Sequence, residues 1–230
     1  SESAQSGTEH FILHLPAGLV DVEERRVPVT LTVPGIHNAR NATAALLAAV
    51  MLGVDVERAA AAATSFLGAA RRFQIRGSVN QVTVIDDYAH HPTEIAALLD
   101  AARRRYPEAG IHVIFQPHLF SRTMFFAREF AEALAKADDV IVTGIFPARE
   151  KQEDFPTVSP DTIVNEAVKL EHEPADDWIR GVDDMRTAAQ MMVMRAHHGD
   201  VIFTVGAGNI TQMDPVILHA LEAHRWDCAR

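Results

Sequence analysis

The sequence predicts an α/β fold whose larger, C-terminal part is a Rossmann-like, mostly parallel sheet with crossover helices. Four short apolar runs rich in β-branched residues recur along this part, at 82–85, 111–115, 139–143 and 200–205. Most of these runs are separated by helix-like segments, an alternation that is typical of a parallel sheet. Hydrophobic residues make up 48% of the 230 residues and charged residues 23%, proportions that favour a globular chain with a packed core.

The N-terminal part has a different pattern. Short alternating runs between residues 10 and 33, interrupted by prolines and glycine, predict the strands of a small meander. We leave residues 1–9 out of this fold, as a frayed end. An alanine-rich segment over 37–53, with apolar residues on most faces, predicts a buried helix, and a second helix is expected over 56–66.

A domain boundary is expected in the stretch GAARRF, residues 68–73. The helical pattern stops there, and the alternation of strands and helices begins after it. We therefore predict two domains, covering residues 1–72 and 73–230.

Charge and composition exclude several classes of protein. Lys and Arg total 21 against 31 Asp and Glu, a net charge of -10, which argues against a general surface for nucleic acid or anionic membrane. The longest nearly continuous apolar run, 44–54, is too short to span a bilayer, and no segment has the pattern of a secretion signal. The single cysteine, Cys228, cannot form an intramolecular disulfide. A cytoplasmic protein without a membrane or nucleic-acid partner is expected.

The stretch VIDDYAHHPTEI, residues 84–95, concentrates ionisable side chains between a strand and a helix. The strand is expected to end at Asp86 and Asp87, and Pro92 stands where a first helical residue belongs. Ligands of open parallel sheets bind outside the carboxyl ends of the strands, which favours a binding site here. The alternative is structural: one aspartate and one histidine cap the helix and bind backbone.

The stretch FQPHLFSRT repeats this arrangement after the second apolar run, before a helix expected to begin near Met124. Its polar residues are Gln116, His118, Ser121, Arg122 and Thr123. The Arg122 guanidinium can pair with a carboxylate or phosphate in a forked geometry. Its alternative role is that of a solvated arginine at a helix start.

Three further features are weaker. Gly206 and Gly208, in TVGAGNIT, let backbone approach a ligand closely or form an ordinary tight turn. Asn38 and Asn41 share one face of a helix start, where amides can bind the edge of a base or cap the helix. His90 and His91 are adjacent, and so are His197 and His198, whereas helical metal ligands need spacings of three or four, so no protein-bound metal is predicted.

Taken together and in order, GIHNARNATAA, RRF, DDYAHHPTEI, FQPHLFSRT and GAGNI closely resemble the Mur ligase family of peptidoglycan synthesis. The resemblance covers essentially everything after about residue 10. Within the family it is greatest to the member that joins L-alanine to UDP-N-acetylmuramate. The member that reattaches recycled tripeptides is similar at DD.AHHPT but does not usually carry FQPH..SRT.

The resemblance implies a part of a three-domain enzyme. Neither a P-loop sequence, G-x-x-x-x-G-K-[ST], nor a UDP-binding domain occurs in these 230 residues. Residues 1–72 would be the C-terminal part of the central ATP-binding domain, and residues 73–230 the C-terminal Rossmann-like ligase domain. The family uses ATP with Mg²⁺ to form an acyl phosphate, which the amine of the amino acid then attacks. This chain alone is expected to be inactive without the N-terminal and P-loop domains.

The resemblance also implies roles for individual residues. The nucleotide side would comprise Asn38, Asn41, Arg72 and Asp87. The side of the amino acid and UDP-N-acetylmuramate would comprise Tyr88, His90, His118 and Arg122. The family often has arginine directly after the histidine of FQPH, but this chain has Leu119 there, so Arg122 is the expected contact for an anionic group.

Two alternatives stay open at this point. One is the tripeptide-recycling ligase of the same family. The other is a non-catalytic, Rossmann-like nucleotide-binding module, against which the absence of G-x-G-x-x-G after the first strand of the repeat argues.

Overall fold

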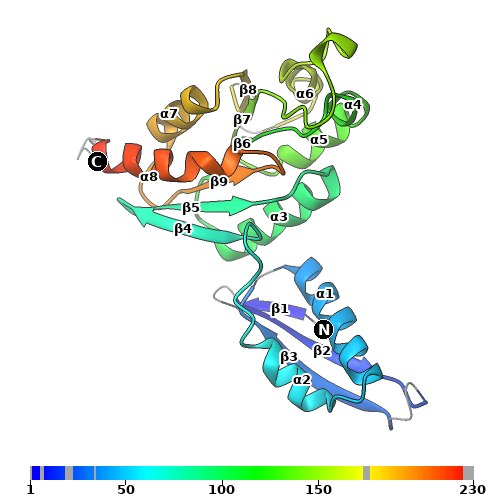
Figure 1. Ribbon diagram of the computed structural model, residues 1–230. Helices are drawn as coiled ribbons and strands as arrows, with labels where there is room; N and C mark the ends of the chain where they lie inside the picture. Colours follow the sequence, from blue (N-terminus) through cyan, green and yellow to red (C-terminus); the bar gives the residue numbers. More distant parts are fainter. Residues whose placement is uncertain (1, 6–7, 19–22, 34, 173–176, 225–230) are drawn as a thin grey trace. The chain divides into compact units, whose positions relative to one another are not determined.

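The computed structural model describes residues 2–5, 8–18, 23–33, 35–172 and 177–224 (Figure 1). It divides into two compact units, one of residues 1–69 with 100–107 and the other of residues 70–99 with 108–230. The expectation about Cys228 lies outside the described residues. Within the described ranges, every helix is too short or too polar to cross a membrane.

The first unit contains a three-stranded antiparallel sheet of β1 (Glu2–Gln5), β2 (Thr8–Leu15) and β3 (Arg25–Leu31). A meander was expected, but its strands differ from the prediction. Residues 2–5, which the prediction treats as part of a frayed end, pair with β2. The third strand continues through Pro28, which a sheet tolerates because β3 is an edge strand with one side free of ladder hydrogen bonds.

Two helices, α1 (Ile36–Met51) and α2 (Val56–Ala63), pack against this sheet. In α1 the prediction of burial on most faces is wrong: only one stripe, Ala39, Leu46 and Val50, is buried. Alanine's high helix propensity explains the composition instead, because exposed alanines also stabilise a helix. Asp55 caps α2, accepting a 3.0 Å hydrogen bond from the Arg58 N–H.

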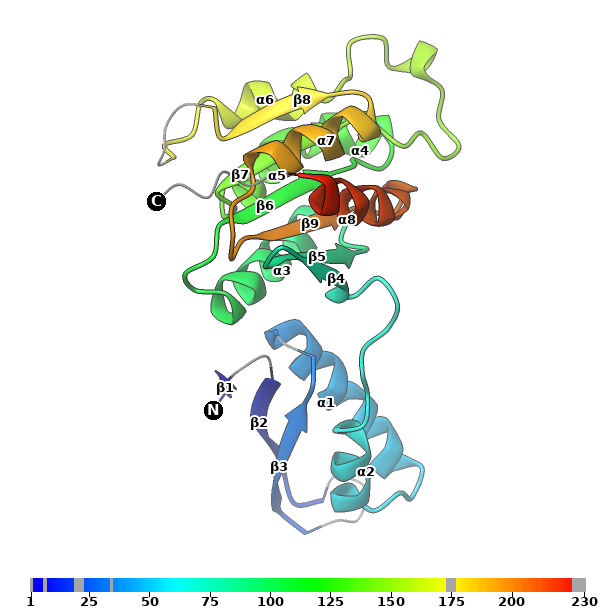
Figure 2. The same ribbon diagram turned by 90° about the vertical axis from the view of Figure 1, so that its left-hand side faces the viewer.

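The second unit is built on a six-stranded sheet, in the order β4-β5-β9-β6-β7-β8 (Figure 2). The strands are β4 (Gln74–Val79), β5 (Val82–Asp87), β6 (Ile111–Phe115), β7 (Asp139–Thr143), β8 (Ile179–Val182) and β9 (Val201–Val205). All neighbours are parallel except β4, which is antiparallel to β5. The predicted fold class and its four core strands are confirmed, while the two edge strands were not predicted.

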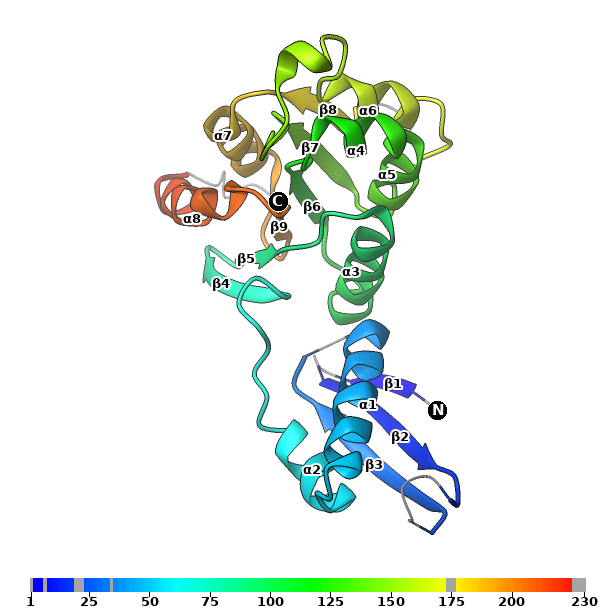
Figure 3. The ribbon, with the colours of Figure 1, turned by 45° about the vertical axis from the view of Figure 1, so that its right-hand side comes forward.

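Helices cover both faces of this sheet (Figure 3). The helices α7 (Met185–Arg195) and α8 (Asp214–Ala223) pack on the face that carries Val84 and Ile202. The helices α3 (Pro92–Arg105) and α5 (Ala127–Leu134) lie on the other side. Short helices α4 (Phe120–Phe125) and α6 (Asp161–Ala167), and the 3₁₀ turns Gln152–Asp154 and Ile210–Met213, complete the unit.

Two boundaries matter for the site, of which the first agrees with the prediction and the second differs from it. β5 runs to Asp87, so both aspartates are the last residues of the strand. The helix expected near Met124 begins at Phe120, so Ser121, Arg122 and Thr123 are helical.

The loops that follow β5, β6 and β9 form one rim at the carboxyl edge of the sheet, and the strand order places them there. Because β9 lies between β5 and β6, Asp87 and Phe115 both pair with Val205. The loops after these three strands therefore start from the same level at the carboxyl edge of the sheet.

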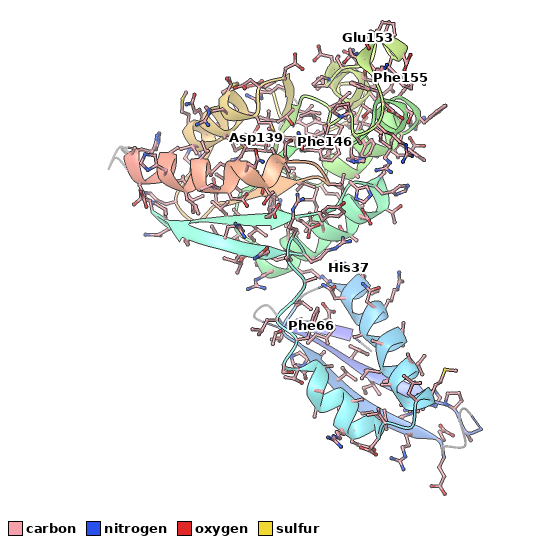
Figure 4. The ribbon with its side chains drawn as sticks, viewed as in Figure 1. His37, Phe66, Asp139, Phe146, Glu153 and Phe155 are labelled. Carbon is pink, nitrogen blue, oxygen red and sulfur yellow. The ribbon has the colours of Figure 1, made fainter. Side chains whose placement is uncertain are left out.

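The opposite edge carries a buried ionic network. His112 lies between two carboxylates, with Nε2 at 2.8 Å from Asp200 and Nδ1 at 3.3 Å from Asp139. Arg180 and Arg195 also bind Asp139, at 3.0 and 2.8 Å (Asp139 is labelled in Figure 4). Charges removed from water need such partners, so this network fixes the starts of β6, β7 and β9 relative to one another.

Candidate active site

The four residues expected on the substrate side lie together at the carboxyl edge of the second unit's sheet. The Tyr88 and His90 rings are 5.3 Å apart, and the His90 and His118 rings 6.0 Å, both edge to face. Arg122 Nη1 is 3.5 Å from the carbonyl oxygen of His90. Residues from the loop after β5 and from the segment after β6 thus form one cluster of aromatic and basic groups, a composition suited to an anionic substrate.

His118 is held against Phe146, which the sequence did not single out. The two rings stack 5.6 Å apart (Phe146 is labelled in Figure 4). The backbone fixes the pair, because Leu119 N donates to Phe146 O and Phe146 N donates to Pro117 O, at 2.9 and 2.8 Å. Burial lowers the pKa of His118, and the charge of Arg122 lowers it further. A neutral imidazole is therefore favoured beside a cation.

Arg122 is fixed through the residue before it. Glu150, in the segment after β7, accepts hydrogen bonds from both the N–H and the Oγ of Ser121, at 3.0 and 2.5 Å. These bonds hold the first turn of α4, which carries the half-buried Arg122.

Asp87 has both carboxylate oxygens engaged by backbone. They accept hydrogen bonds from the N–H groups of Phe73 and Ala89, at 2.7 and 2.8 Å, and the residue is 5% exposed. Burial raises the pKa of Asp87 to about 6, although these two bonds act in the opposite direction. The structural alternative for this stretch expected one aspartate to bind backbone, and Asp87 does so.

The helix after this stretch starts with a reciprocal capping arrangement of His91 and Glu94. Glu94 Oε2 accepts hydrogen bonds from the N–H groups of His90 and His91, at 3.0 and 3.2 Å. His91 Nδ1 accepts a 3.3 Å bond from Thr93 N, within the helix, so His91 is the histidine that caps it, as the structural alternative expected. His90 therefore does not cap the helix with its ring.

The remaining nucleotide-side residues divide between the units. Arg72 is exposed, with its guanidinium carbon 5.7 Å from the centre of the Tyr88 ring. Asn38 and Asn41 belong to the first unit, within α1. Gly35 is the N-cap of α1, so neither asparagine holds the capping position.

The rim loop after β9 is packed against its neighbour. An ideal Cβ on Gly206, whose φ is +148°, would lie 2.6 Å from Gln116 O. Gln116 also binds this loop, accepting from Ile210 N at 3.1 Å and donating to Asn209 Oδ1 at 2.9 Å. The close approach that needs glycine is therefore to Gln116, and this role of Gln116 was not predicted.

Arg71 is a further residue that sequence reasoning missed. Its guanidinium binds Asp86 at 3.1 Å and the carbonyl oxygens of Gly206 and Gly208 at 2.5 and 3.2 Å. A possible signal was present: Asp86 ends an apolar strand, where a buried carboxylate needs a cationic partner. Among the described residues there is no group of three or more His, Cys, Asp or Glu side chains placed to hold a metal ion.

Comparison with known proteins agrees with this geometry. The family model for the Mur ligase, glutamate ligase domain matches residues 71–208. A UDP-N-acetylmuramate–L-alanine ligase of Bifidobacterium adolescentis is 82% identical over 228 residues, 99% of this chain and 44% of that protein. The same-named protein of Renibacterium salmoninarum is 44% identical over 88% of this chain and 41% of its own length. The chain thus spans less than half the length of these relatives.

Solved structures show the same relationship. The crystal structure of a UDP-N-acetylmuramate–alanine ligase from Thermotoga maritima has a TM-score of 0.75 and 27% identity, covering 97% of this chain and 45% of that one. A murein peptide ligase from Psychrobacter arcticus has a TM-score of 0.67 and 25% identity, covering 97% and 44%. The family match runs from Arg71, before β4, to Gly208, in the loop after β9, and with it the chain belongs to the Mur ligase family.

Proposed function

We propose that this chain is the C-terminal part of an ATP-dependent ligase that joins L-alanine to UDP-N-acetylmuramate in peptidoglycan synthesis. In this reaction the muramate carboxylate attacks the γ-phosphate of ATP, giving an acyl phosphate and ADP. The amine of L-alanine then attacks the acyl carbon, phosphate leaves, and the nitrogen loses a proton to give the amide.

The observation that carries this proposal is the cluster of Tyr88, His90, His118 and Arg122 at one edge of the sheet. The cluster supplies a fixed cation beside a histidine that its surroundings keep neutral. The names of the relatives at 82% and 44% identity support L-alanine as the amino acid.

On the substrate side, we assign Arg122 to the carboxylate of L-alanine. A guanidinium held by its helix can form a forked pair with a carboxylate. His118 can accept a hydrogen bond from an ammonium group, because a neutral imidazole has one free acceptor nitrogen. Tyr88 and His90 complete the wall on the side of UDP-N-acetylmuramate.

On the nucleotide side, we assign Asn38 and Asn41 to adenine, and Arg72 to the phosphates or ribose. Asp87 serves this side through the backbone that it holds, since its carboxylate is covered by Phe73 and Ala89. Mg²⁺ would enter with ATP, neutralising phosphate charge.

The domain assignment follows from the same proposal. Residues 1–72 would be the C-terminal part of the central ATP-binding domain, and 73–230 the C-terminal ligase domain. The N-terminal and P-loop domains of the same enzyme would be its partners, in the cytoplasm. We expect this chain alone to lack ATPase and ligase activity, because it has no P-loop to cradle the phosphates.

The decisive experiment compares the full-length gene product with the 230-residue chain. Each is incubated with ATP, Mg²⁺, UDP-N-acetylmuramate and L-alanine, and phosphate release and the UDP-linked product are measured. We expect both signals from the full-length protein, dependent on L-alanine, and neither from the chain alone. Phosphate release by the chain at the rate of the full-length protein would contradict the assignment of catalysis to the missing domains.

The tripeptide-recycling ligase remains the second candidate, favoured by the likeness to the murein peptide ligase structure. Replacing L-alanine by the tripeptide in the same assay separates the two. Turnover with tripeptide and none with L-alanine would reverse our choice. Binding of a nicotinamide dinucleotide without any ligation would indicate the non-catalytic module instead.

A further inference from the structure

Arg71, at the start of the second unit, contacts several separate segments of that unit. Besides the bonds of its guanidinium to Asp86, Gly206 and Gly208, its carbonyl oxygen accepts a 2.7 Å bond from Tyr88 N. Its own N–H donates to Gln74 Oε1 at 2.9 Å. The residue therefore connects the segment entering the second unit, the end of β5 and the loop after β9.

The backbone on either side of Arg72 is held in a conformation that side chains rarely adopt. The φ angle is +59° at Arg71 and +48° at Phe73. Such angles persist only where surrounding contacts compensate for them. Here Arg71 is fixed by its own bonds and Phe73 by its bond to Asp87, so that Arg72 lies between two anchored residues.

The two carbonyl bonds distinguish this arrangement from simple charge neutralisation. Asp86 is fully buried and also accepts from Thr211 Oγ1 at 3.0 Å. A cation that only balanced this carboxylate would need no contact with the rim. Arg71 instead uses its other two nitrogens on the loop of Gly206 and Gly208, which only a planar fork of donors can do.

We infer that Arg71 is a positioning residue for nucleotide binding: its guanidinium ties the segment that carries Arg72 and Tyr88 to the loop after β9. The inference rests on the proposed function for the role of Arg72. The guanidinium carbon of Arg72 lies 5.7 Å from the centre of the Tyr88 ring. Without Arg71, the backbone that carries both residues is no longer tied to the loop after β9, and Arg72 is no longer held for the nucleotide.

The same unit offers a matched control in Arg76. Its Nε lies 3.0 Å from Asp214, a carboxylate as buried as Asp86 and joined to it through Thr211, which contacts both. Arg71→Met and Arg76→Met each leave a buried carboxylate without its arginine. Only the first removes contacts to the rim loop.

The experiment measures the dissociation constant of ATP for the full-length protein by titration calorimetry, at a temperature where all variants are folded. The variants are Arg71→Met, Arg71→Lys and Arg76→Met. We expect the ATP Kd to rise about tenfold in both Arg71 variants, as for loss of a charged hydrogen-bonded contact. Arg76→Met should stay within about twofold of wild type. Thermal melting should show Arg71→Lys as more stable than Arg71→Met, since lysine still balances Asp86.

Two results would overturn the inference. A wild-type ATP Kd in Arg71→Lys would mean that charge alone suffices, and an equal rise in Arg76→Met would mean that general destabilisation is the cause. If Arg71→Met does not fold, Arg71→Lys alone decides. A wild-type protein that binds ATP but does not ligate L-alanine would refute the proposed function and leave this test in place.

Discussion

The N–H of Phe73 donates a 2.7 Å hydrogen bond to the buried carboxylate of Asp87, so the segment entering the second unit is fastened to the end of β5. The other carboxylate oxygen binds Ala89 N. One acidic side chain thus fixes the backbone on both sides of the rim, and its ionisation should be visible in the stability of the fold.

For Asp87 we predict stability that declines as pH rises. The pKa of Asp87 is raised from its ordinary value of 3.8 to about 6, so the folded state binds this proton more tightly than the unfolded chain. The contribution of the protonated Asp87 carboxyl to the free energy of unfolding is complete below about pH 4 and is lost by about pH 6. The free energy of unfolding of wild type, relative to Asp87→Asn, should fall by up to roughly 3 kcal/mol across this window.

Urea denaturation of the 230-residue chain at several pH values measures this difference. Asp184→Asn is the control, because hydrogen bonds to Thr187 lower the pKa of Asp184 and its contribution is lost as pH falls. A wild-type advantage over Asp87→Asn that increased from pH 4 to pH 6 would contradict the prediction.

For His112 we predict a stabilising contribution that disappears in mild alkali. Burial alone lowers the pKa of His112, but its hydrogen bonds to Asp139 and Asp200 outweigh burial and raise it from 6.5 to about 9. The contribution of the imidazolium is therefore complete below pH 6.5 and is lost as pH rises to 9. His112→Gln should remove this dependence, which amounts to roughly 3 kcal/mol.

The measurement is again the free energy of unfolding, between pH 6 and pH 9.5. His219→Gln, at an exposed helical position, should follow the wild-type curve. Parallel curves for wild type and His112→Gln would show that the histidine is not charged in the fold.

For Arg122 we predict a selective effect on the amino acid. In the full-length enzyme, Arg122→Ala should raise the KM for L-alanine about ten- to hundredfold, the effect of losing a hydrogen bond to a charged group. The KM for ATP should change little, because Arg122 follows a different strand from the nucleotide-side residues. Steady-state kinetics with ATP and L-alanine varied separately measure both constants.

Arg128→Ala is the matched control for this variant. Arg128 lies on the next helix and pairs with Glu132 at 2.8 Å on the surface, so its loss should leave both constants unchanged. If Arg122→Ala, like Arg128→Ala, left both KM values unchanged, Arg122 would be a solvated residue at a helix start that does not contact L-alanine.

For Gly206 we predict a large loss of stability on substitution by alanine. The new Cβ would meet Gln116 O at 2.6 Å, at a φ of +148°. Gly199 separates the two causes, because its φ is +94° but nothing lies within 4 Å of its Cβ position. Gly199→Ala should cost about 1 kcal/mol and Gly206→Ala roughly 2 to 4 kcal/mol. Equal losses in urea denaturation would mean that backbone strain is the whole effect.

The core strands could be predicted because their sequences are nearly continuous apolar runs, as in IHVIF at 111–115. The edge strands could not be predicted from their own sequences. β4 reads QIRGSV and is largely exposed, and β8, IRGV, has one buried residue. Neither has a period that distinguishes a strand from a loop, so their pairing depends on the neighbouring strand and not on local sequence.

The site shows the same division. That Tyr88, His90, His118 and Arg122 lie together could be predicted because they follow strand ends, and the sheet brings strand ends together. Phe146 and Gln116 act through contacts with residues distant in sequence, His118 and Asn209. The motif predicts that Asp87 binds the nucleotide, whereas in the fold its buried carboxylate accepts hydrogen bonds from backbone N–H groups. Position in a motif alone does not distinguish a residue that binds substrate from one that supports it.

The position of β9 has a consequence for biosynthesis. It is the last strand along the residues that the structure describes, yet β5 and β6 each pair with it. Until residues 201–205 leave the ribosome, the second unit can form only two separate pieces, β4-β5 and β6-β7-β8, each with an unpaired inner edge. Such edges template association with other chains. The nascent second unit therefore depends on protection, or on rapid completion, until its central strand is synthesised.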